Sequence, residues 1–132
     1  MNEFFEHKLQ VNISHLDNLK HVNNVQYLQW VQDISNAHWK KLTEGVTYSI
    51  GIWVVRRHKI TYKRPAKLND WLTLKTYVTK TEGFLSERRV HIYFKDTSIL
   101  VTQCETEWCY LNPKTLKPEL IPEEVLRILF KK

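Results

Sequence analysis

One long helical pattern, followed by four strand-like runs, limits the folds that this chain can adopt. From position 24 to position 42, apolar residues recur at the 3.6-residue period of a helix and cover a wide arc of its surface. The residues of this arc are Tyr27, Leu28, Trp30, Val31, Ile34, Ala37, His38 and Leu42. The width of the arc predicts a helix that is covered on most sides. We expect Asn23 or Asn24 to cap its start and Gly45 to occupy the C′ position after its end.

Alternation of apolar and polar residues predicts five strands to accompany this helix. Residues 4–14 alternate first, and one face of this run holds Phe5, His7, Leu9, Val11 and Ile13. Four longer runs follow the helix, at 52–63, 71–80, 84–94 and 100–110. Short links around Gly83 and at 96–98 predict hairpins, so we expect the four runs to form a meander. Residues 122–130 open with proline and two glutamates and predict a short helix.

These elements predict an α+β fold, in which a long antiparallel sheet curls around one central helix. The 132 residues fit a single domain, 1–132, whose core needs neither disulfides nor a structural metal. No apolar run approaches the roughly 20 residues of a membrane helix. The N-terminal sequence MNEFFEHKLQ lacks the pattern of a signal or transit peptide. We therefore expect a cytoplasmic protein that does not associate with membranes.

Several kinds of chemistry are missing from the sequence. Cys104 and Cys109 lie five positions apart on a strand-like run, which predicts two free thiols on opposite faces. The six histidines show no HxxxH spacing, and there is no CxxC pair, so we expect no metal site. Three glycines are too few for a phosphate-binding loop, and no G-x-S-x-G motif occurs. The net charge of +6 attracts nucleic acid, anionic lipid or a phosphorylated small molecule, without choosing among them.

The segment HLDNLKHVNNVQYLQW, residues 15–30, carries a run of polar residues straight into the helical pattern. Taken one at a time, its residues have ordinary structural roles. Asp17 is typical of a turn, Asn23 or Asn24 of a helix cap, and His21 of a partly exposed loop.

Taken together, the segment resembles the signature of the hotdog-fold acyl thioesterases. These include the 4-hydroxybenzoyl-CoA thioesterase-like acyl-CoA thioester hydrolases, to which the plant acyl-ACP thioesterases are related. The residues that match in register are Leu16, Asp17, His21, Val22, Asn23, Asn24, Val25, Tyr27 and Trp30. Downstream, HKITYKRPAKLND at 58–70 resembles the family's second strand, which ends in Arg-Pro before an Asp-containing turn.

Two positions depart from the family pattern. The usual glycine three residues after the aspartate is Lys20, and the asparagine that the plant enzymes carry two residues after it is Leu19. Because glycine serves where the backbone takes a positive φ or approaches a ligand, we expect a differently shaped loop at Lys20.

The resemblance implies hydrolysis of acyl-CoA, or of acyl-ACP, to free acid and thiol, and with it a place in fatty acid metabolism. Asp17 is implied as the attacking group, either as general base on a water or as nucleophile, and both routes stay open. Backbone N–H groups at the start of the helix, with the positive end of its dipole behind them, would stabilise the oxyanion. Asn24 would add a donor or position water, and His21 would donate a hydrogen bond to Asp17 or to substrate.

The phosphates of coenzyme A call for basic residues near the strand ends. Lys63 and Arg64, together with the adjoining Pro65, are preferred because of the Arg-Pro match. The further candidates are Arg56, Arg57, Arg88 and Arg89, and the alternative is that all are solvated surface residues. CoA is here part of the substrate, so no cofactor is implied.

The family resemblance further implies a homodimer or homotetramer with residues of both chains in each site. Two other functions stay open. One is a non-catalytic acyl-binding or scaffold protein on the same fold, which the replacement of the usual glycine by Lys20 suggests. The other, more weakly supported, is a nucleic-acid binder. The second is disfavoured because the basic residues are spread along the chain.

Overall fold

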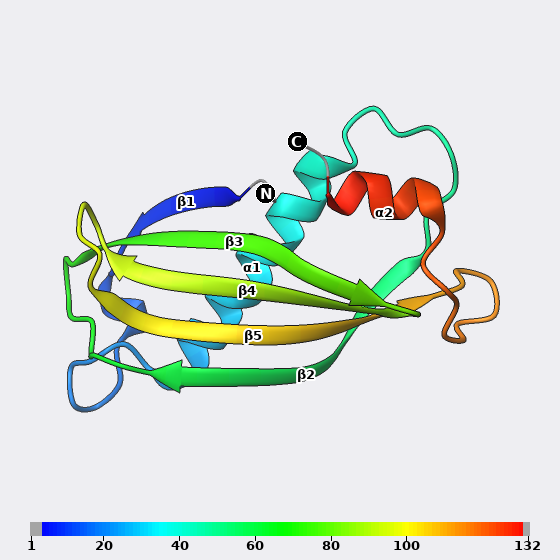
Figure 1. Ribbon diagram of the computed structural model, residues 1–132. Helices are drawn as coiled ribbons and strands as arrows, with labels where there is room; N and C mark the ends of the chain where they lie inside the picture. Colours follow the sequence, from blue (N-terminus) through cyan, green and yellow to red (C-terminus); the bar gives the residue numbers. More distant parts are fainter. Residues whose placement is uncertain (1–3, 131–132) are drawn as a thin grey trace.

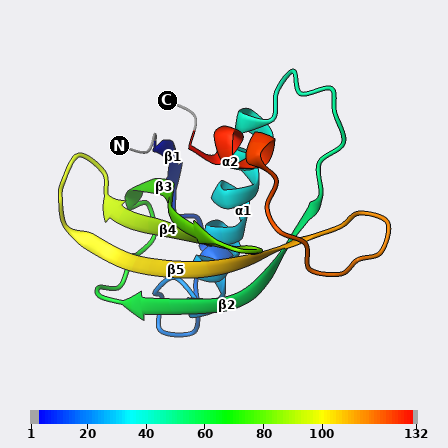
Figure 2. The same cartoon turned by 45° about the vertical axis from the view of Figure 1, so that its right-hand side comes forward.

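The computed structural model describes residues 4–130 and arranges them as one curved sheet with a long helix on its inner face (Figure 1). The elements are, in chain order, β1 (Phe5–Gln10), a 3₁₀ turn (Ile13–His15), α1 (Asn24–Leu42), β2 (Ile52–Tyr62), β3 (Trp71–Glu82), β4 (Leu85–Phe94), β5 (Leu100–Leu111) and α2 (Glu123–Leu129). A view turned by 45° shows the sheet bending around α1 (Figure 2). The predicted α+β arrangement of a long antiparallel sheet around one central helix is confirmed.

The sheet is antiparallel, and its strand order is β1-β3-β4-β5-β2. The two predicted hairpins are confirmed, since β3 pairs with β4 and β4 pairs with β5. The predicted meander of four strands is wrong for β2, which pairs with β5 instead of β3. β1 occupies the free side of β3, where Leu9 lies opposite Leu72. The segment 63–70 therefore carries the chain from one edge of the sheet towards the other.

The first strand is shorter than its alternation predicts. β1 ends at Gln10, and Ile13 is 78% exposed in the 3₁₀ turn, not on the inner face of a strand. Asn12 is the cause, because its Oδ1 accepts from the N–H of Ser14 while its own N–H donates to Nδ1 of His15. This reciprocal capping box turns the backbone before the alternation ends.

Helix α1 has the predicted start and the predicted buried face. Asn23 is the N-cap, with its Oδ1 accepting from the N–H of Val25 at 3.0 Å. The buried residues of α1 are Tyr27, Trp30, Val31, Ile34, Ser35, His38 and Leu42. The predicted C′ position of Gly45 is wrong by one residue: Thr43 is the C-cap, and Gly45, with φ +78°, lies two residues after it. Thr43 extends the last turn because its hydroxyl donates to the carbonyl of Trp39.

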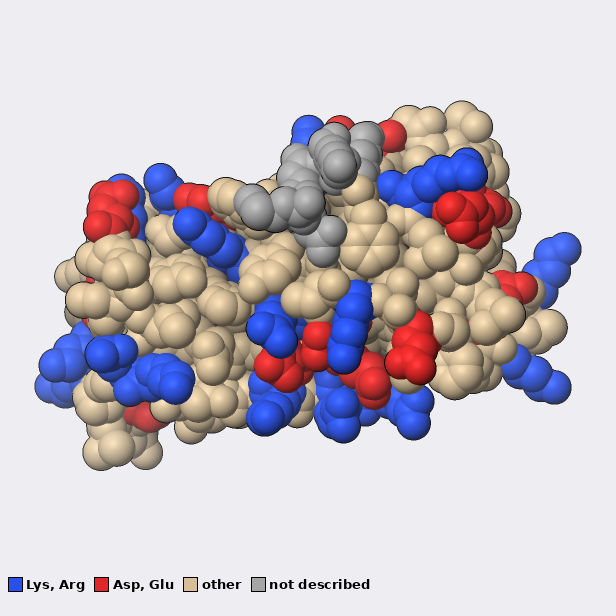
Figure 3. Space-filling view, viewed as in Figure 1, with Lys and Arg blue, Asp and Glu red and all other residues tan. Residues whose placement is uncertain are grey.

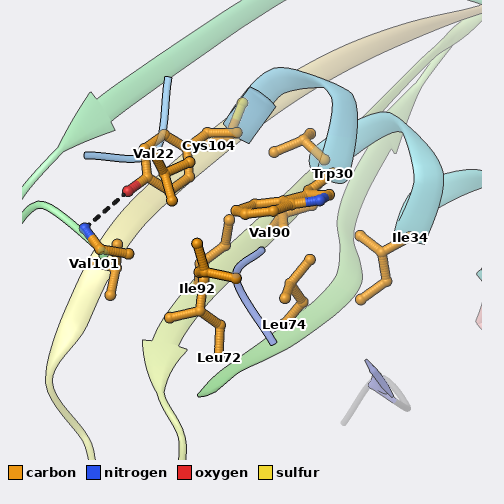
Figure 4. Close-up of a cluster of buried hydrophobic side chains, with 13 residues drawn as sticks. Val22, Trp30, Ile34, Leu72, Leu74, Val90, Ile92, Val101 and Cys104 are labelled. Carbon is orange, nitrogen blue, oxygen red and sulfur yellow. Dashed lines mark hydrogen bonds between the residues drawn. The ribbon is translucent and has the colours of Figure 1, made fainter. Parts of the chain in front are cut away.

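The main core lies between α1 and the inner face of the sheet (Figure 4). Trp30 and Ile34 of α1 pack over side chains from β3, β4 and β5, which include Leu72, Leu74, Val90, Ile92, Val101 and Cys104. The thiol of Cys104 is thus part of the core, and both it and Cys109 are buried and free. Burial raises the pKa of the Cys104 thiol, so it stays protonated at neutral pH.

A second cluster closes the far end of α1. Val125 and Leu129 of α2 pack there with Val78 and Tyr110 from the sheet. α2 begins after Pro122 with Glu123 and Glu124 in its first turn, as the sequence predicts. Among residues 4–130, no helix has the length and apolar character needed to cross a membrane.

Candidate active site

A tight loop at residues 16–22 carries Asp17 towards the start of α1. Leu16 and Val22 form an antiparallel bridge, and inside it the N–H of Asp17 donates to the carbonyl of His21 at 2.8 Å. The loop turns at Lys20, whose φ is +63°. Lys20 thus adopts the left-handed conformation that glycine favours, at the position where the family pattern has glycine.

The two carboxylate oxygens of Asp17 differ in their surroundings. Oδ1 accepts from the backbone N–H groups of Leu19, at 2.8 Å, and His21, at 3.2 Å. Oδ2 has no hydrogen-bond partner among residues 4–130. Asp17 is therefore a turn residue through one oxygen, while the other remains available to a ligand. His21 bonds to Asp17 through its backbone, not through the ring donor that the sequence suggested.

The start of α1 has one N–H group that the cap does not use. The N–H of Val25 donates to Oδ1 of Asn23, and the N–H of Gln26 donates to the carbonyl of Asn23 at 2.8 Å. The N–H of Asn24 has no partner within the described part of the chain. The positive end of the helix dipole reinforces this donor.

A cavity of about 220 Å³ joins this loop, the helix start and the end of β2. Its lining residues are Asp17, His21, Val22, Asn24, Tyr27, Tyr62, Lys63, Arg64 and Pro65. The structure thus brings the three predicted catalytic residues together with Lys63, Arg64 and Pro65 of the predicted CoA-binding set. Lys63 and Arg64 are held there because both backbone N–H groups donate to the carbonyl of Val101. The Arg64 guanidinium also donates to the carbonyl of Leu100, at 3.0 Å.

Two tyrosines form the inner wall of this cavity. The Tyr27 hydroxyl accepts from the N–H of Ala66 at 3.2 Å, and burial raises its pKa. The Tyr62 hydroxyl lies 3.4 Å from the carbonyl of Asn24, and its ring is 5.8 Å from that of Tyr27. Sequence reasoning did not select Tyr62. The available signal was its alternation with Ile60, which puts it on the helix-facing side of β2 just before Lys63.

Arg57 and Arg89 lie away from this cavity. Both belong to the sheet face that points away from α1, where charged groups of both signs gather (Figure 3). Arg57, with a side chain 73% exposed, lies 3.9 Å from Glu107, and Arg89 lies 3.6 Å from Glu105. The structure therefore does not place these two arginines, or the further candidates Arg56 and Arg88, in the lining of the Asp17 cavity. Elsewhere in residues 4–130, no group of three or more His, Cys, Asp or Glu side chains could hold a metal ion.

Comparison with known proteins shows the family to which the chain belongs. The family described as acyl-ACP thioesterase, N-terminal domain, matches residues 2–129 of the chain. The chain belongs to this family. The long-chain acyl-CoA thioesterase FadM of Escherichia coli (strain K12) is 32% identical over 81 residues, which are 58% of this chain. That match spans 59% of FadM, less than two thirds of its length.

Solved structures of thioesterases share the fold. YbaW, a probable thioesterase from Escherichia coli, gives a TM-score of 0.82 at 23% identity, covering 96% of this chain and 98% of its own. A mutant 4-hydroxybenzoyl-CoA thioesterase complexed with 4-hydroxybenzoyl-CoA gives 0.81 at 13% identity, covering 96% and 98%. Identities this low establish the fold alone, and the predicted hotdog fold is confirmed.

Proposed function

We propose that this protein is a thioesterase that hydrolyses acyl-CoA to free acid and CoA, with acyl-ACP as the alternative substrate. Membership of the thioesterase family and the 32% identity to an acyl-CoA thioesterase support the reaction class. One observation carries the proposal. Asp17 and Asn24 line the same cavity at the start of α1, and among residues 4–130 neither Oδ2 of Asp17 nor the N–H of Asn24 has a hydrogen-bond partner.

In the proposed reaction, the thioester carbonyl docks against the start of α1. The N–H of Asn24 and the helix dipole stabilise the negative oxygen that forms when the carbonyl is attacked. Oδ2 of Asp17 either removes a proton from the attacking water or attacks the carbonyl itself to form a mixed anhydride. In the first route the C–S bond then breaks, and the CoA thiolate takes up the proton that Asp17 removed from water. In the second, departure of the thiolate leaves the mixed anhydride, which water hydrolyses to the free acid and the Asp17 carboxylate, and the thiolate takes up the proton that this water releases. The Oδ1 hydrogen bonds from Leu19 and His21 hold the carboxylate in place during these steps.

Lys63 and Arg64 are proposed to bind the phosphates of the carrier. Both are exposed at the mouth of the cavity, next to Pro65. A cation at this position pairs with phosphate without being buried, so it contributes to binding more than to the chemical step. Arg64 is partly committed to Leu100, which leaves Lys63 as the freer charge.

A second copy of the chain is proposed to complete the site. Ligand sites commonly occupy about 300–1,000 Å³, and a cavity of about 220 Å³ is too small to enclose an acyl chain and a pantetheine arm. β2 stands at the end of the strand order, and its last residue, Tyr62, lines this cavity and is 41% exposed. A homodimer, or a homotetramer built from dimers, would extend the cavity with residues of the partner.

The proposal is tested by thiol release from a panel of acyl-CoAs with Asp17→Asn beside the parent. Asn keeps an oxygen for the Leu19 and His21 N–H groups but cannot act as base or nucleophile, so kcat should fall about 100- to 10,000-fold. Asp33→Asn is the matched control, since Asp33 is an exposed α1 residue that accepts from Gln29. Equal rates for the parent and Asp17→Asn would remove Asp17 from the chemistry.

The same assay decides between catalysis and the non-catalytic alternative. Lys20 was the sequence reason for an acyl-binding or scaffold role, and its φ of +63° weakens that reason because the loop keeps a left-handed residue there. Acyl-CoA binding without thiol release from any substrate would establish the binding role instead.

A further inference from the structure

A second cavity, of about 310 Å³, lies at the opposite end of α1 from Asp17. It is bordered by the later turns of α1, the start of β2, the inner faces of β4 and β5, and α2. Its α1 residues begin at Ser35, about 16 Å along the helix from Asn24. The two cavities share no lining residue, so the second is a separate feature of the fold.

A buried arginine forms part of its wall. Alternation along β4 turns Arg88 inward with Ser86 and Val90, and Arg88 is only 4% exposed. Its Nη1 donates to Nδ1 of His38 at 2.7 Å and to the hydroxyl of Thr76 at 3.1 Å. Both partners are neutral acceptors: burial and the charge of Arg88 lower the pKa of His38 to about 4.

The charge of Arg88 is not balanced by any described residue. Among residues 4–130, no carboxylate lies within ion-pair distance of Arg88, whereas the neighbouring Arg89 lies 3.6 Å from Glu105. Burial lowers the pKa of Arg88 to about 10, so it remains charged at neutral pH. A buried charge without a counter-charge is costly, and an anion entering the cavity would remove that cost.

The other walls are largely aromatic. Trp39, Trp53 and Trp108 line the cavity, and Nε1 of Trp53 and of Trp108 is buried without a hydrogen-bond partner in the described chain. An indole N–H can only donate, and a guanidinium can only donate. Ser35, Asn36 and Ser86 are the uncharged polar residues of the lining, and the guanidinium of Arg88 is the one charged group among the described residues that form it.

We propose that this cavity binds a small molecule with one carboxylate on an apolar body, the carboxylate meeting Arg88 and the body lying between the indole rings. A volume of about 310 Å³ is at the small end of ligand sites, which suits an aromatic or short-chain acid. One negative charge matches one guanidinium in a planar, two-point contact. The carboxylate is supplied either by a free acid or by the far end of an acyl chain.

Titration calorimetry with benzoate and hexanoate tests the proposal, with tryptophan fluorescence as a second readout. Three of the five tryptophans line the cavity, so an occupant should change their emission. The parent should bind both acids saturably. Arg88→Met, which keeps an unbranched apolar stem but removes the guanidinium, should weaken binding about 10- to 100-fold. Arg89→Met, one residue away on the outer face, should bind as the parent does.

Neutral analogues keep the test decisive if Arg88→Met does not fold. Benzamide and hexanamide match the two acids in shape and should bind the intact parent at least about tenfold more weakly. Equal binding of amide and acid, no saturable binding of either acid, or full binding by a folded Arg88→Met would each overturn the proposal.

A second arm identifies the source of the carboxylate. Thiol release is compared for an acyl-CoA with a terminal carboxyl group and for its unsubstituted analogue of equal length. If Arg88→Met loses activity only towards the carboxylated substrate, the acyl chain supplies the carboxylate. If Arg88→Met leaves the ratio of the two thiol-release rates unchanged but loses benzoate binding, a free acid supplies the carboxylate. The calorimetry needs no turnover, so it stands even if thioester hydrolysis fails.

Discussion

His38 links the stability of this fold to pH. Its ring is 3% exposed, stacks on Phe5 at 5.2 Å between centroids, and accepts from Arg88 at 2.7 Å. Burial, and then the charge of Arg88, lower the pKa of His38 from 6.5 to about 4. The folded protein therefore keeps the ring neutral between pH 6.5 and 4, while the unfolded chain binds a proton there.

The sign and size of the effect follow from this difference. Because the unfolded state binds more protons in this window, stability is fully present above about pH 6.5 and falls as the pH drops to about 4. At about 1.36 kcal/mol for each pH unit, the loss attributable to His38 is about 3 kcal/mol. That is a large part of the roughly 5–15 kcal/mol that stabilises a typical domain.

Urea unfolding of the parent and of His38→Gln between pH 7.5 and about 4 measures this contribution. The glutamine side chain of this variant can still accept from Arg88 but does not titrate, so the parent should lose about 3 kcal/mol more than the variant. Burial also lowers the pKa of His15, His58 and His91, and these groups are common to both proteins, so they cancel in the comparison. His7→Gln, at an exposed position of β1, controls for the loss of one imidazole. Parallel pH profiles for the parent and His38→Gln would refute the argument.

Three further changes test the loop, the cavity mouth and the packing near α2. Lys20→Gly should raise the free energy of unfolding by about 0.5–1 kcal/mol. Relief of the left-handed strain at φ +63° in the folded state exceeds the entropy that glycine adds to the unfolded chain. A loss of stability in chemical denaturation would contradict this. Lys63→Ala should raise KM for acyl-CoA severalfold with kcat nearly unchanged, and a KM that stays constant at low salt would exclude a phosphate contact. Gly51→Ala should lower the free energy of unfolding by about 1–3 kcal/mol, because the new Cβ would lie 2.4 Å from the carbonyl oxygen of Leu111 and 2.6 Å from the ring of Tyr110. An unchanged melting temperature would show that the backbone moves freely there.

The parts of the fold that the sequence predicts well are those set by local pattern. α1 and the two hairpins follow from periodicity, caps and short links, and each of these acts within a few neighbouring residues. The place of β2 depends on pairing with β5, far along the chain, and alternation carries no information about which strand lies beside which. The irregularity between Val55 and Arg57 adds to this, because it turns Trp53 inward and exposes Val54, which a continuous alternation from Tyr62 would not predict.

The predicted CoA-binding residues were also only partly placed correctly by the sequence. Charge alone made Arg57 and Arg89 candidates, beside the pair Lys63 and Arg64 that the Arg-Pro match favoured. Alternation already separated them, since Val90 and Ile92 face the core and Arg89 must then face away. Within a strand, the direction of a side chain therefore predicts better than its charge whether it can reach the cavity. Lys63 and Arg64 follow the end of β2, where alternation no longer fixes the direction, and there the basic residues do line the cavity.

Ala66 explains why two separate sequence segments meet at one cavity. Its N–H donates to the Tyr27 hydroxyl and its carbonyl accepts from the N–H of Val22, at 3.2 and 2.9 Å, so both of its backbone groups bind the segment that carries Asp17. The side chain is fully buried, with no room for a larger residue. Next to it, a bridge between His21 and Lys67 continues the same contact. The position of Lys63 and Arg64 relative to Asp17 is thus set by backbone bonds to a buried residue, so the geometry of the cavity should persist even when the exposed charges at its mouth are changed.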